Sequence, residues 1–194
     1  MICGVAPAVP ALGTFAIFTP AAEATRVTTI IGNGDPFTPG TPAPGDGGPA
    51  NLAPLTPGGL AFDAPRQRAY VSDGGRLRRV DLQTNTITTI AGNFGGIADE
   101  QDGVDAREFP FASGPIAVDR NGNIFFAGLN ACSINRIDAQ TNVVRRVAGL
   151  GPNPVTLECR YDGDGGRATM ADIHWSGGLA FDADGNLFFA QLVF

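Results

Sequence analysis

Residues 58–82, GGLAFDAPRQRAYVSDGGRLRRVDL, decide the architecture of this chain because their pattern is written three times. It returns as GPIAVDRNGNIFFAGLNACSINRIDA at residues 114–139, and its first half returns as GGLAFDADGNLFFAQ at residues 177–191. Each copy opens with glycine, continues with an apolar run that ends in aspartate, and reaches a second apolar run after a turn. Short runs rich in Val, Ile and Phe, separated by Asp-Gly or Asn-Gly, predict strands joined by tight turns. Self-similarity at a long period predicts a repeat architecture.

Each complete copy is predicted to contain four short strands. The fourth strand is represented by ITTIAGN at 87–93 and VRRVAGL at 144–150, and VTTIIGN at 27–33 has the same pattern ahead of the first complete copy. The predicted strands of the first copy lie at about 58–63, 68–73, 77–82 and 86–91, and those of the second near 114–119, 123–128, 133–138 and 143–148.

The long connections between the copies keep a pattern of their own. Asp46, Asp102 and Asp164 are each followed by Gly and have an Ala four residues later. Agreement in three connections predicts that these segments are ordered parts of the repeat. Each connection joins a fourth strand to the next first strand, so we expect the long loops to share one rim of the scaffold, where binding commonly resides.

Four short antiparallel strands in each of several units predict the blades of a β-propeller. The stretch GDGGPANLAPLTPGGLAFD (45–63), with YVSD (70–73) and LRRVD (77–81) behind it, resembles the NHL repeat of bacterial and extracellular propellers. The resemblance covers nearly everything from residue 27 onward. It implies an all-β fold of NHL-like blades, with the partial propeller spanning 27–194 and its blades at about 58–91, 114–148 and 177–194.

The number of blades departs from that of a closed ring. The copies amount to two and a half to three blades, whereas closed propellers typically have about four to eight. We therefore expect an incomplete ring, from a fragment or a truncated product.

The composition is that of a globular chain with an acidic balance. Of the 194 residues 43% are apolar and 16% are charged, with a formal net charge of −6. Clustered cations bind phosphate backbones, so this balance argues against a nucleic-acid partner. The apolar runs are too short and broken to predict a membrane span. Three cysteines leave one thiol over, and both a Cys132–Cys159 disulfide and separate thiols remain open.

Residues 1–26 have two interpretations. The small-residue ending Ala22-Glu23-Ala24 suits a secretory cleavage site, although the segment begins without Lys or Arg. Alternatively, residues 13–30 can be laid over residues 75–90 as strands three and four of a preceding blade. The first interpretation predicts a secreted or periplasmic protein, and otherwise the protein is expected to be cytoplasmic.

The hairpin interpretation has a consequence for ring closure. Strands three and four at the N-terminus complement the strand-one and strand-two half at 177–191, which gives three blades' worth of strands. Self-association through the incomplete blades, as a head-to-tail dimer with six blades, follows from this arithmetic.

Six repeated aspartates are predicted to have structural roles in turns. Short Asp side chains before Gly commonly accept hydrogen bonds from the backbone of their own turn, and a site used for function is more often unique to one copy. The order of ligands in a calcium loop is absent around Asp164. The six residues are Asp46, Asp102 and Asp164 in the long connections, and Asp63, Asp119 and Asp182 at the ends of the first strands.

The predicted binding residues are those that occur in one copy only. His174 and Trp175 are the only His and Trp, and they are adjacent just before a first strand, where a titratable group and a ring could meet a ligand. Packing between blades is the alternative role for Trp175. Asp73 and Arg76 flank a short connection on the same rim. Arg76, Arg78 and Arg79 are expected to form a small cationic patch of a solvated face.

These features favour a non-catalytic binding or interaction module whose ligand contacts come from the long inter-blade loops. A single His and no Cys-rich cluster exclude a multi-His zinc site within the chain, and we expect no metal, no cofactor and no catalytic residue here. The expected partner is a protein, or a small-molecule or carbohydrate ligand. The alternative is a fragment of a lactonase- or lyase-like propeller enzyme whose catalytic blades are missing.

Overall fold

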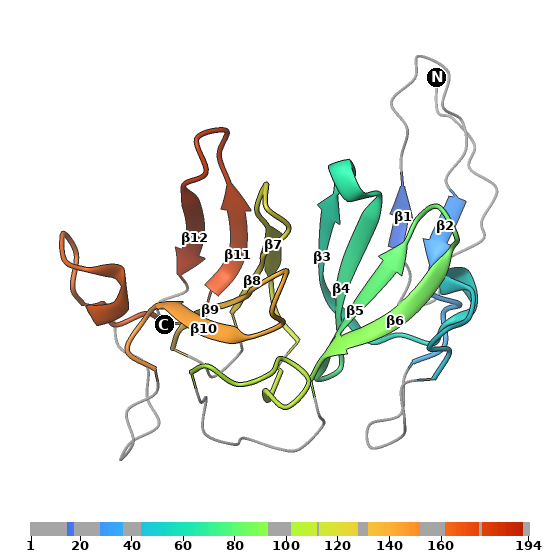
Figure 1. The fold of residues 1–194 in the computed structure, drawn as a ribbon, viewed down its shortest axis with the longest axis horizontal. Coiled ribbons are helices and arrows are strands. Elements are labelled where there is room, and N and C mark those ends of the chain that lie inside the picture. The colour runs from blue at the N-terminus through green and yellow to red at the C-terminus, as the bar shows by residue number, and fades with distance from the viewer. Residues whose placement is uncertain are drawn as a thin grey trace, which may run out of the picture.

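The computed structural model describes residues 15–17, 28–36, 44–92, 102–111, 113–127, 132–151, 162–174 and 176–191. Within these residues the regular elements are β-strands and three single-turn 3₁₀-helices, arranged as a row of separate antiparallel sheets (Figure 1). The 3₁₀-helices are η1 (Ala50–Leu52), η2 (Ala64–Arg66) and η3 (Ala168–Met170). No helix in the described part of the chain is long and apolar enough to cross a membrane.

Two sheets have four strands each and follow the predicted order from first to fourth strand. We call them blade 1 and blade 2. Blade 1 consists of β3 (Pro57–Asp63), β4 (Arg68–Asp73), β5 (Arg76–Asp81) and β6 (Thr86–Ala91). Blade 2 consists of β7 (Ile116–Val118), β8 (Ile124–Ala127), β9 (Ile134–Ile137) and β10 (Val144–Ala148). The prediction of four-stranded antiparallel blades is confirmed.

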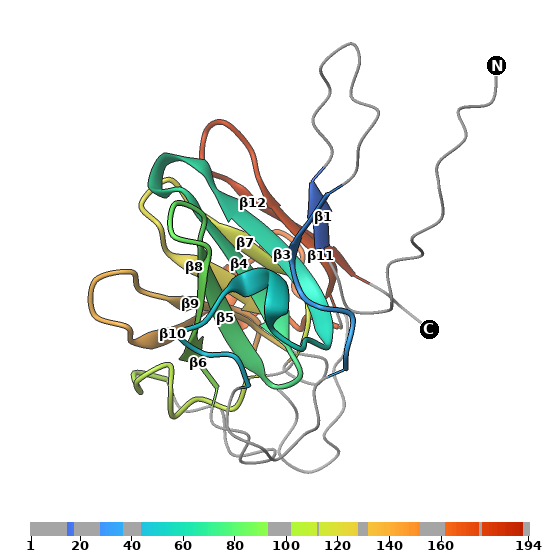
Figure 2. The same cartoon turned by 90° about the vertical axis from the view of Figure 1, so that its right-hand side faces the viewer.

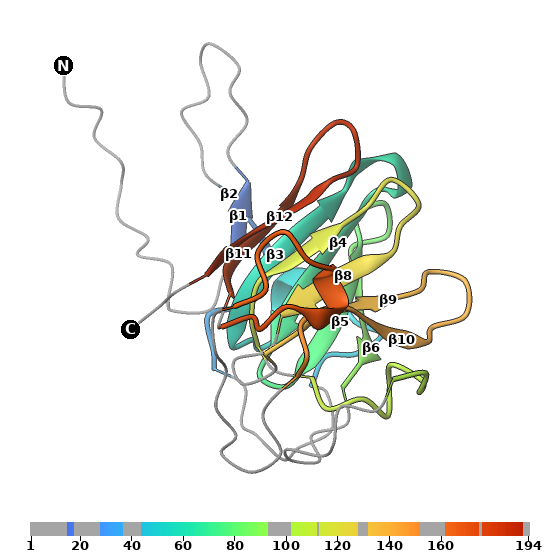
Figure 3. The same cartoon turned by 90° about the vertical axis from the view of Figure 1, so that its left-hand side faces the viewer.

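Two further sheets have two strands each among the described residues, and they lie at the two ends of the row (Figure 1). The N-terminal half-blade is β1 (Phe15–Ile17) paired with β2 (Thr28–Ile31), and the C-terminal half-blade is β11 (Ser176–Phe181) paired with β12 (Leu187–Gln191). The end with β1 and β2 faces the viewer in Figure 2, and the end with β11 and β12 does so in Figure 3.

The N-terminal half-blade has the strand pairing of strands three and four. Phe15 pairs with Ile31 as Leu77 pairs with Ala91 in blade 1, and the register shifts at the same place, directly after Phe15 and after Leu77. β1 and β2 are thus paired as strands three and four are in the overlay of residues 13–30, and whether residues 1–26 belong to a preceding blade stays a prediction. Residues 1–14 and 18–27 lie outside the described residues, so the signal-like interpretation of this segment stays a prediction.

First strands of successive blades lie side by side, with β3 against β7 and β7 against β11. The glycine that opens each copy allows this approach. A Cβ on Gly59 would meet the backbone carbonyl oxygen of Gly114 at the start of blade 2. The Ser72 hydroxyl donates a 2.8 Å hydrogen bond to that same oxygen. A side chain at Gly59 would therefore push the two blades apart.

The core lies in the seams between blades and not within any one sheet. Phe126 of blade 2 contacts the rings of Phe109 and Phe111 at centroid distances of 5.6 and 4.7 Å. Each such side chain contributes about 1.5–3 kcal/mol when buried. The buried side chains of the seam between blades 1 and 2 are Tyr70, Leu77, Ala91, Ala106, Phe109, Phe111, Ile116, Ile124, Phe126, Ile137 and Val144.

Gly92 allows a test of the close backbone packing at the end of β6. Gly92 follows β6 with φ +91°, and an added Cβ would meet the carbonyl oxygen of Gly75. Gly47 has φ +81° and open space around its Cβ position. We expect Gly47→Ala to cost roughly 1–2 kcal/mol for backbone strain alone, and Gly92→Ala to cost clearly more because backbone atoms must also move. Urea unfolding of both variants measures the difference, and equal losses would contradict the predicted contact.

Candidate interaction site

Two blade faces stay open at the ends of the row. On β3, Leu60 is 44% exposed and Phe62 is 59% exposed, and on β12 Phe188 is 60% exposed. We call Leu60 and Phe62 the β3 face, and Phe188 with its cross-strand partner Ala180 the β12 face. Isolated exposed apolar residues are common on proteins. We therefore compare the exposed fraction of each of these side chains with that of the equivalent residue in another copy of the repeat.

The same repeat positions are buried where two blades meet. Ile116 of blade 2 corresponds to Leu60 in the aligned copies and is only 5% exposed. Tyr70 pairs with Ala61 as Phe188 pairs with Ala180, and Tyr70 is 3% exposed. The β3 face and the β12 face therefore correspond to the two opposite sides of a blade seam, and both are exposed.

A cavity of about 670 Å³ opens next to the C-terminal half-blade. Phe125 and Phe181 meet edge to face at 4.9 Å on one part of its wall. Ile134 and Ala148 line the outer part, at the positions that Leu77 and Ala91 occupy in blade 1. The further lining residues include Val118, Val147, Leu187 and Phe189, with Asp119, Arg120 and Asp182 among the polar ones.

The position of the cavity follows from the repeat. Leu77 and Ala91 share the closed seam with Ile137 and Val144, which come from the third and fourth strands of blade 2. The described residues of the C-terminal half-blade provide only a first and a second strand. Among the described residues, no side chain of the second seam corresponds to Ile137 or Val144, and the cavity lies beside this seam.

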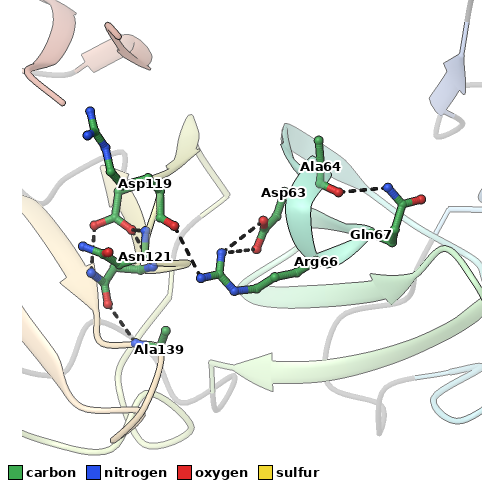
Figure 4. A network of polar contacts seen from close by, with 9 residues as sticks. Asp63, Ala64, Arg66, Gln67, Asp119, Asn121 and Ala139 are labelled. Carbon is green, nitrogen blue, oxygen red and sulfur yellow. Dashed lines mark hydrogen bonds and ion pairs between the residues drawn. The ribbon is translucent and has the colours of Figure 1, made fainter. Parts of the chain in front are cut away.

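Asp119 and Asp182 hold the turns between first and second strands. One carboxylate oxygen of Asp119 accepts hydrogen bonds from the backbone N–H groups of Asn121 and Asn123 at 2.8 and 2.9 Å (Figure 4). Asp182 accepts from Asp184 and Asn186 at 3.0 and 2.8 Å. Hydrogen bonds from Asn186, side chain and backbone, lower the pKa of Asp182.

Asp63 differs from these two because a 3₁₀ turn follows it. Its carboxylate forms a 3.2 Å ion pair with Arg66, whose guanidinium also donates to the backbone carbonyl of Arg120 at 3.4 Å (Figure 4). Arg120 in turn donates to the carbonyl of Ala183 at 2.7 Å. These arginines link the turns of three successive units.

Asp46 and Asp102 connect their loops to the outer strand of their own blade. Asp46 accepts from the Thr89 backbone at 3.0 Å, and Asp102 from the Arg146 backbone at 2.8 Å. The expected contact was with their own turn. The difference arises because the loop runs beside the fourth strand, with Gly47 N–H donating to the carbonyl of Ile87 at 2.8 Å. Asp164 occupies the position of Asp46 and Asp102 in the third connection, within the described segment 162–174.

The expectation of a solvated arginine patch is wrong for Arg76 and Arg78, whose side chains are 1% and 0% exposed. Both lie near the buried carboxylate of Asp73, at 3.7 and 3.4 Å, and Arg78 also pairs with Asp46 at 2.7 Å. Loss of hydration on burial lowers the pKa of Arg76, and the Asp73 carboxylate opposes this effect. The loop containing Asp46 covers the guanidinium of Arg78, so these charges serve blade 1 internally.

The predicted binding residues are placed in different units. Asp73 accepts a 2.6 Å hydrogen bond from the backbone N–H of Thr56, and Gln191 accepts one of 2.9 Å from His174 at the matching position of the C-terminal half-blade. The backbone of His174 therefore makes the hydrogen bond to a second strand that Thr56 makes in blade 1. Trp175 lies outside the described residues. Asp73 and Arg76 lie in blade 1, whereas His174 lies beside the C-terminal half-blade.

Cys132 is disulfide-bonded, and its partner lies outside the described residues. Within the described ranges no group of three or more His, Cys, Asp or Glu side chains could hold a metal ion.

The open faces were not found from the sequence. Leu60, Phe62 and Phe188 belong to apolar runs that also occur, buried, in the other copies. The number of strands in each copy could have predicted their exposure. A half-blade has two strands instead of four, so it leaves part of the facing blade uncovered.

No model of a known protein family matches the chain, and no curated protein matches it. Solved structures do match. A protein of unknown function from Bacteroides thetaiotaomicron aligns with 93% of this chain at 19% identity and a TM-score of 0.65. An auxiliary nutrient-binding protein from the same organism aligns with 94% at 15% identity and a TM-score of 0.56. A gluconolactonase from Xanthomonas campestris aligns with 96% at 17% identity and a TM-score of 0.50.

At such identities the likeness shows the fold alone. The chain is an incomplete β-propeller. It spans 40%, 41% and 48% of the lengths of the Bacteroides protein of unknown function, the nutrient-binding protein and the gluconolactonase, which agrees with a row of blades that does not close. Two four-stranded antiparallel blades and two two-stranded half-blades make up the described part of this incomplete propeller.

The buried charges of blade 1 allow a test of their role. Asp73→Asn keeps an acceptor for Thr56 but leaves two buried guanidinium groups without the central carboxylate. We expect a loss of about 3 kcal/mol in the free energy of unfolding. Blade 2 has the buried neutral residues Ser133 and Asn135 where blade 1 has Arg76 and Arg78. Adding Arg76→Ser and Arg78→Asn should therefore recover most of the loss in urea unfolding, and an undiminished loss would contradict this account.

The turn aspartates predict a dependence of stability on pH. Hydrogen bonds lower the pKa of Asp81, Asp138 and Asp182 below the ordinary value of 3.8, chiefly bonds from Thr84, Thr141 and Asn186. A pKa lowered by folding stabilises the protein above the unfolded-state value, and this stability is lost as the pH falls through the folded-state pKa. We expect the unfolding free energy to fall below about pH 4. The triple variant Asp81→Asn, Asp138→Asn, Asp182→Asn should have a shallower acid slope, and an unchanged slope would refute the assignment.

Proposed function

We propose that this chain is a non-catalytic interaction module of the NHL-like propeller type, which binds its partner through the open blade faces. The single observation that carries the proposal is the contrast within the repeat. Leu60 and Phe188 are 44% and 60% exposed, whereas Ile116 and Tyr70 at the equivalent positions are 5% and 3% exposed. Apolar surfaces of this kind mark interaction sites. The partner is a protein, including a second copy of the chain, or a small-molecule or carbohydrate ligand.

The long loops contribute the second part of the binding surface in this proposal. Their described portions are occupied by contacts with the blades, as Asp46 and Asp102 illustrate. The proposal keeps the sequence-predicted ligand contacts in the long loops, including His174 and Trp175, and the loop portions at 37–43, 93–101 and 152–161. These portions lie outside the described residues.

A location outside the cytoplasm, secreted or periplasmic, fits this role. The disulfide at Cys132 supports it, because disulfides persist in oxidising compartments and are rare in the cytosol. The alternative, a fragment of a lactonase- or lyase-like enzyme, draws on the likeness to a gluconolactonase, and at 17% identity that likeness extends to the fold only.

The test compares exposed apolar residues on and off the blade faces. The dye 8-anilino-1-naphthalenesulfonate reports apolar surface by its fluorescence. We expect dilute protein to enhance the dye emission, and the double variant Phe62→Ser, Phe188→Ser to lose about half of the enhancement or more. The matched control is Leu52→Ser, Met170→Ser, since these side chains are 63% and 65% exposed but lie on η1 and η3.

Equal losses in both double variants would contradict a special role for the faces. Hydrolysis of gluconolactone by the purified chain above the spontaneous rate would favour the enzyme alternative instead.

A further inference from the structure

The two half-blades contain complementary strands. β1 and β2 have the pairing of a third and a fourth strand, including the register shift that β5 and β6 show. β11 and β12 have the pairing of a first and a second strand, with Leu179, Ala180 and Phe181 opposite Phe189, Phe188 and Leu187. Together the two half-blades contain each strand of a four-stranded blade once.

Each half-blade also presents the sheet edge that the other needs. In blade 1 the second strand β4 pairs with the third strand β5 on the side away from β3. The equivalent edges, on β12 and on β1, have no strand partner among the described residues. An unpaired edge presents a row of backbone N–H and C=O groups that readily pairs with a further strand.

The apolar faces match in the same sense. In the closed seam, Tyr70 of blade 1 lies in one cluster with Ile116 and, at its margin, Val118 of blade 2. Phe188 corresponds to Tyr70, and Leu60 and Phe62 correspond to Ile116 and Val118. The β12 face of one molecule is therefore built to cover the β3 face of the next, in the geometry that the chain already uses between blades 1 and 2.

We infer that a second copy of this chain occupies the open faces, with its N-terminal half-blade completing the C-terminal half-blade of the first. This inference rests on the proposed interaction role and names its partner. β12 pairs antiparallel with β1 of the second copy, and the register of blade 1 transfers as Ala190 opposite Phe15, Phe189 opposite Ala16, and Phe188 opposite Ile17. The β1–β2 hairpin then covers the outer wall of the cavity at Ile134 and Ala148.

Counting blades sets the size of the assembly. The described residues hold two complete blades and two half-blades, so two copies of these residues joined head to tail at both ends hold six blades. Closed propellers have about four to eight blades, and three chains would supply nine. A heterologous interface that closes after two chains gives a symmetric ring.

Sedimentation velocity over a range of concentrations tests the assembly. We expect the 194-residue chain to form a dimer, and Phe188→Glu or Phe62→Glu to weaken it by about 100-fold or more, because each carboxylate is buried unpaired in a seam. Met170→Glu is the matched control, at a side chain 65% exposed on η3, and should leave the dimer unchanged. Circular dichroism checks that each variant folds.

Mixing the two variants reports the polarity of the contact. A head-to-tail dimer of one Phe62→Glu chain and one Phe188→Glu chain has both substitutions in one seam and a native second seam. We expect the mixture to associate more tightly than either variant alone. Contacts between identical faces predict no such recovery, and that result would overturn the inference.

Disulfide trapping tests the register without depending on affinity. Mixed Ala16→Cys and Phe189→Cys chains should form a cross-linked heterodimer under mild oxidation, to a greater extent than chains without these substitutions. Ala16→Cys mixed with Ala190→Cys should not, because a shift of one residue places the two side chains on opposite faces of the sheet. Equal cross-linking of both mixtures, or of neither, would overturn the proposed pairing.

The dye assay separates this inference from the proposed function. A monomer at all concentrations whose open faces bind the dye would refute the second copy and leave the interaction role standing. A monomer that fails to bind the dye would refute both. A dimer whose dye binding falls as the protein concentration rises supports both.

Discussion

The structure depends on one constraint: a blade has two apolar faces and can bury neither of them by itself. Blades 1 and 2 satisfy this constraint for each other through Tyr70 and Leu77 on one side and Ile116 and Phe126 on the other. Burial of apolar surface is the main favourable contribution to folding, so the seams, more than the sheets, hold the chain together. Beside the two half-blades of the described residues this constraint is not met, and exposed faces and a cavity lie there.

Polar groups adjust the distance and order of the blades. Ser72 bonds the carbonyl of Gly114 across the first seam, and Arg66 and Arg120 link consecutive turns. The loops are fixed as well, through Asp46 and Asp102 on the fourth strands. Blade 1 adds buried charges around Asp73, while blade 2 uses Ser133 and Asn135 in equivalent places. Repeats of one architecture thus tolerate different polar interiors, provided that each buried charge has a counter-charge.

This organisation joins stability to recognition. The surfaces proposed to bind a partner are positions of the repeat that fold against a neighbour elsewhere in the same chain, so recognition reuses the packing of the core. Such a surface is specific because its shape is already realised between blades 1 and 2, and its strand register is realised within blade 1. It is also an aggregation hazard when left uncovered, which favours a partner that covers faces and edges together.

Much of the fold was readable from the sequence. Three copies of a glycine-led pattern determined the number and order of strands, and Asp119 and Asp182 marked the turns, because strand alternation and turn formation depend on residues close together in the chain. Only the tertiary structure decided that Arg76 and Arg78 are buried, that Asp46 bonds the fourth strand, and that Leu60, Phe62 and Phe188 are exposed. These outcomes depend on which distant segments of the chain cover each side chain. The same local pattern occurs in copies where it is buried and in copies where it is exposed, so the local sequence does not predict the burial.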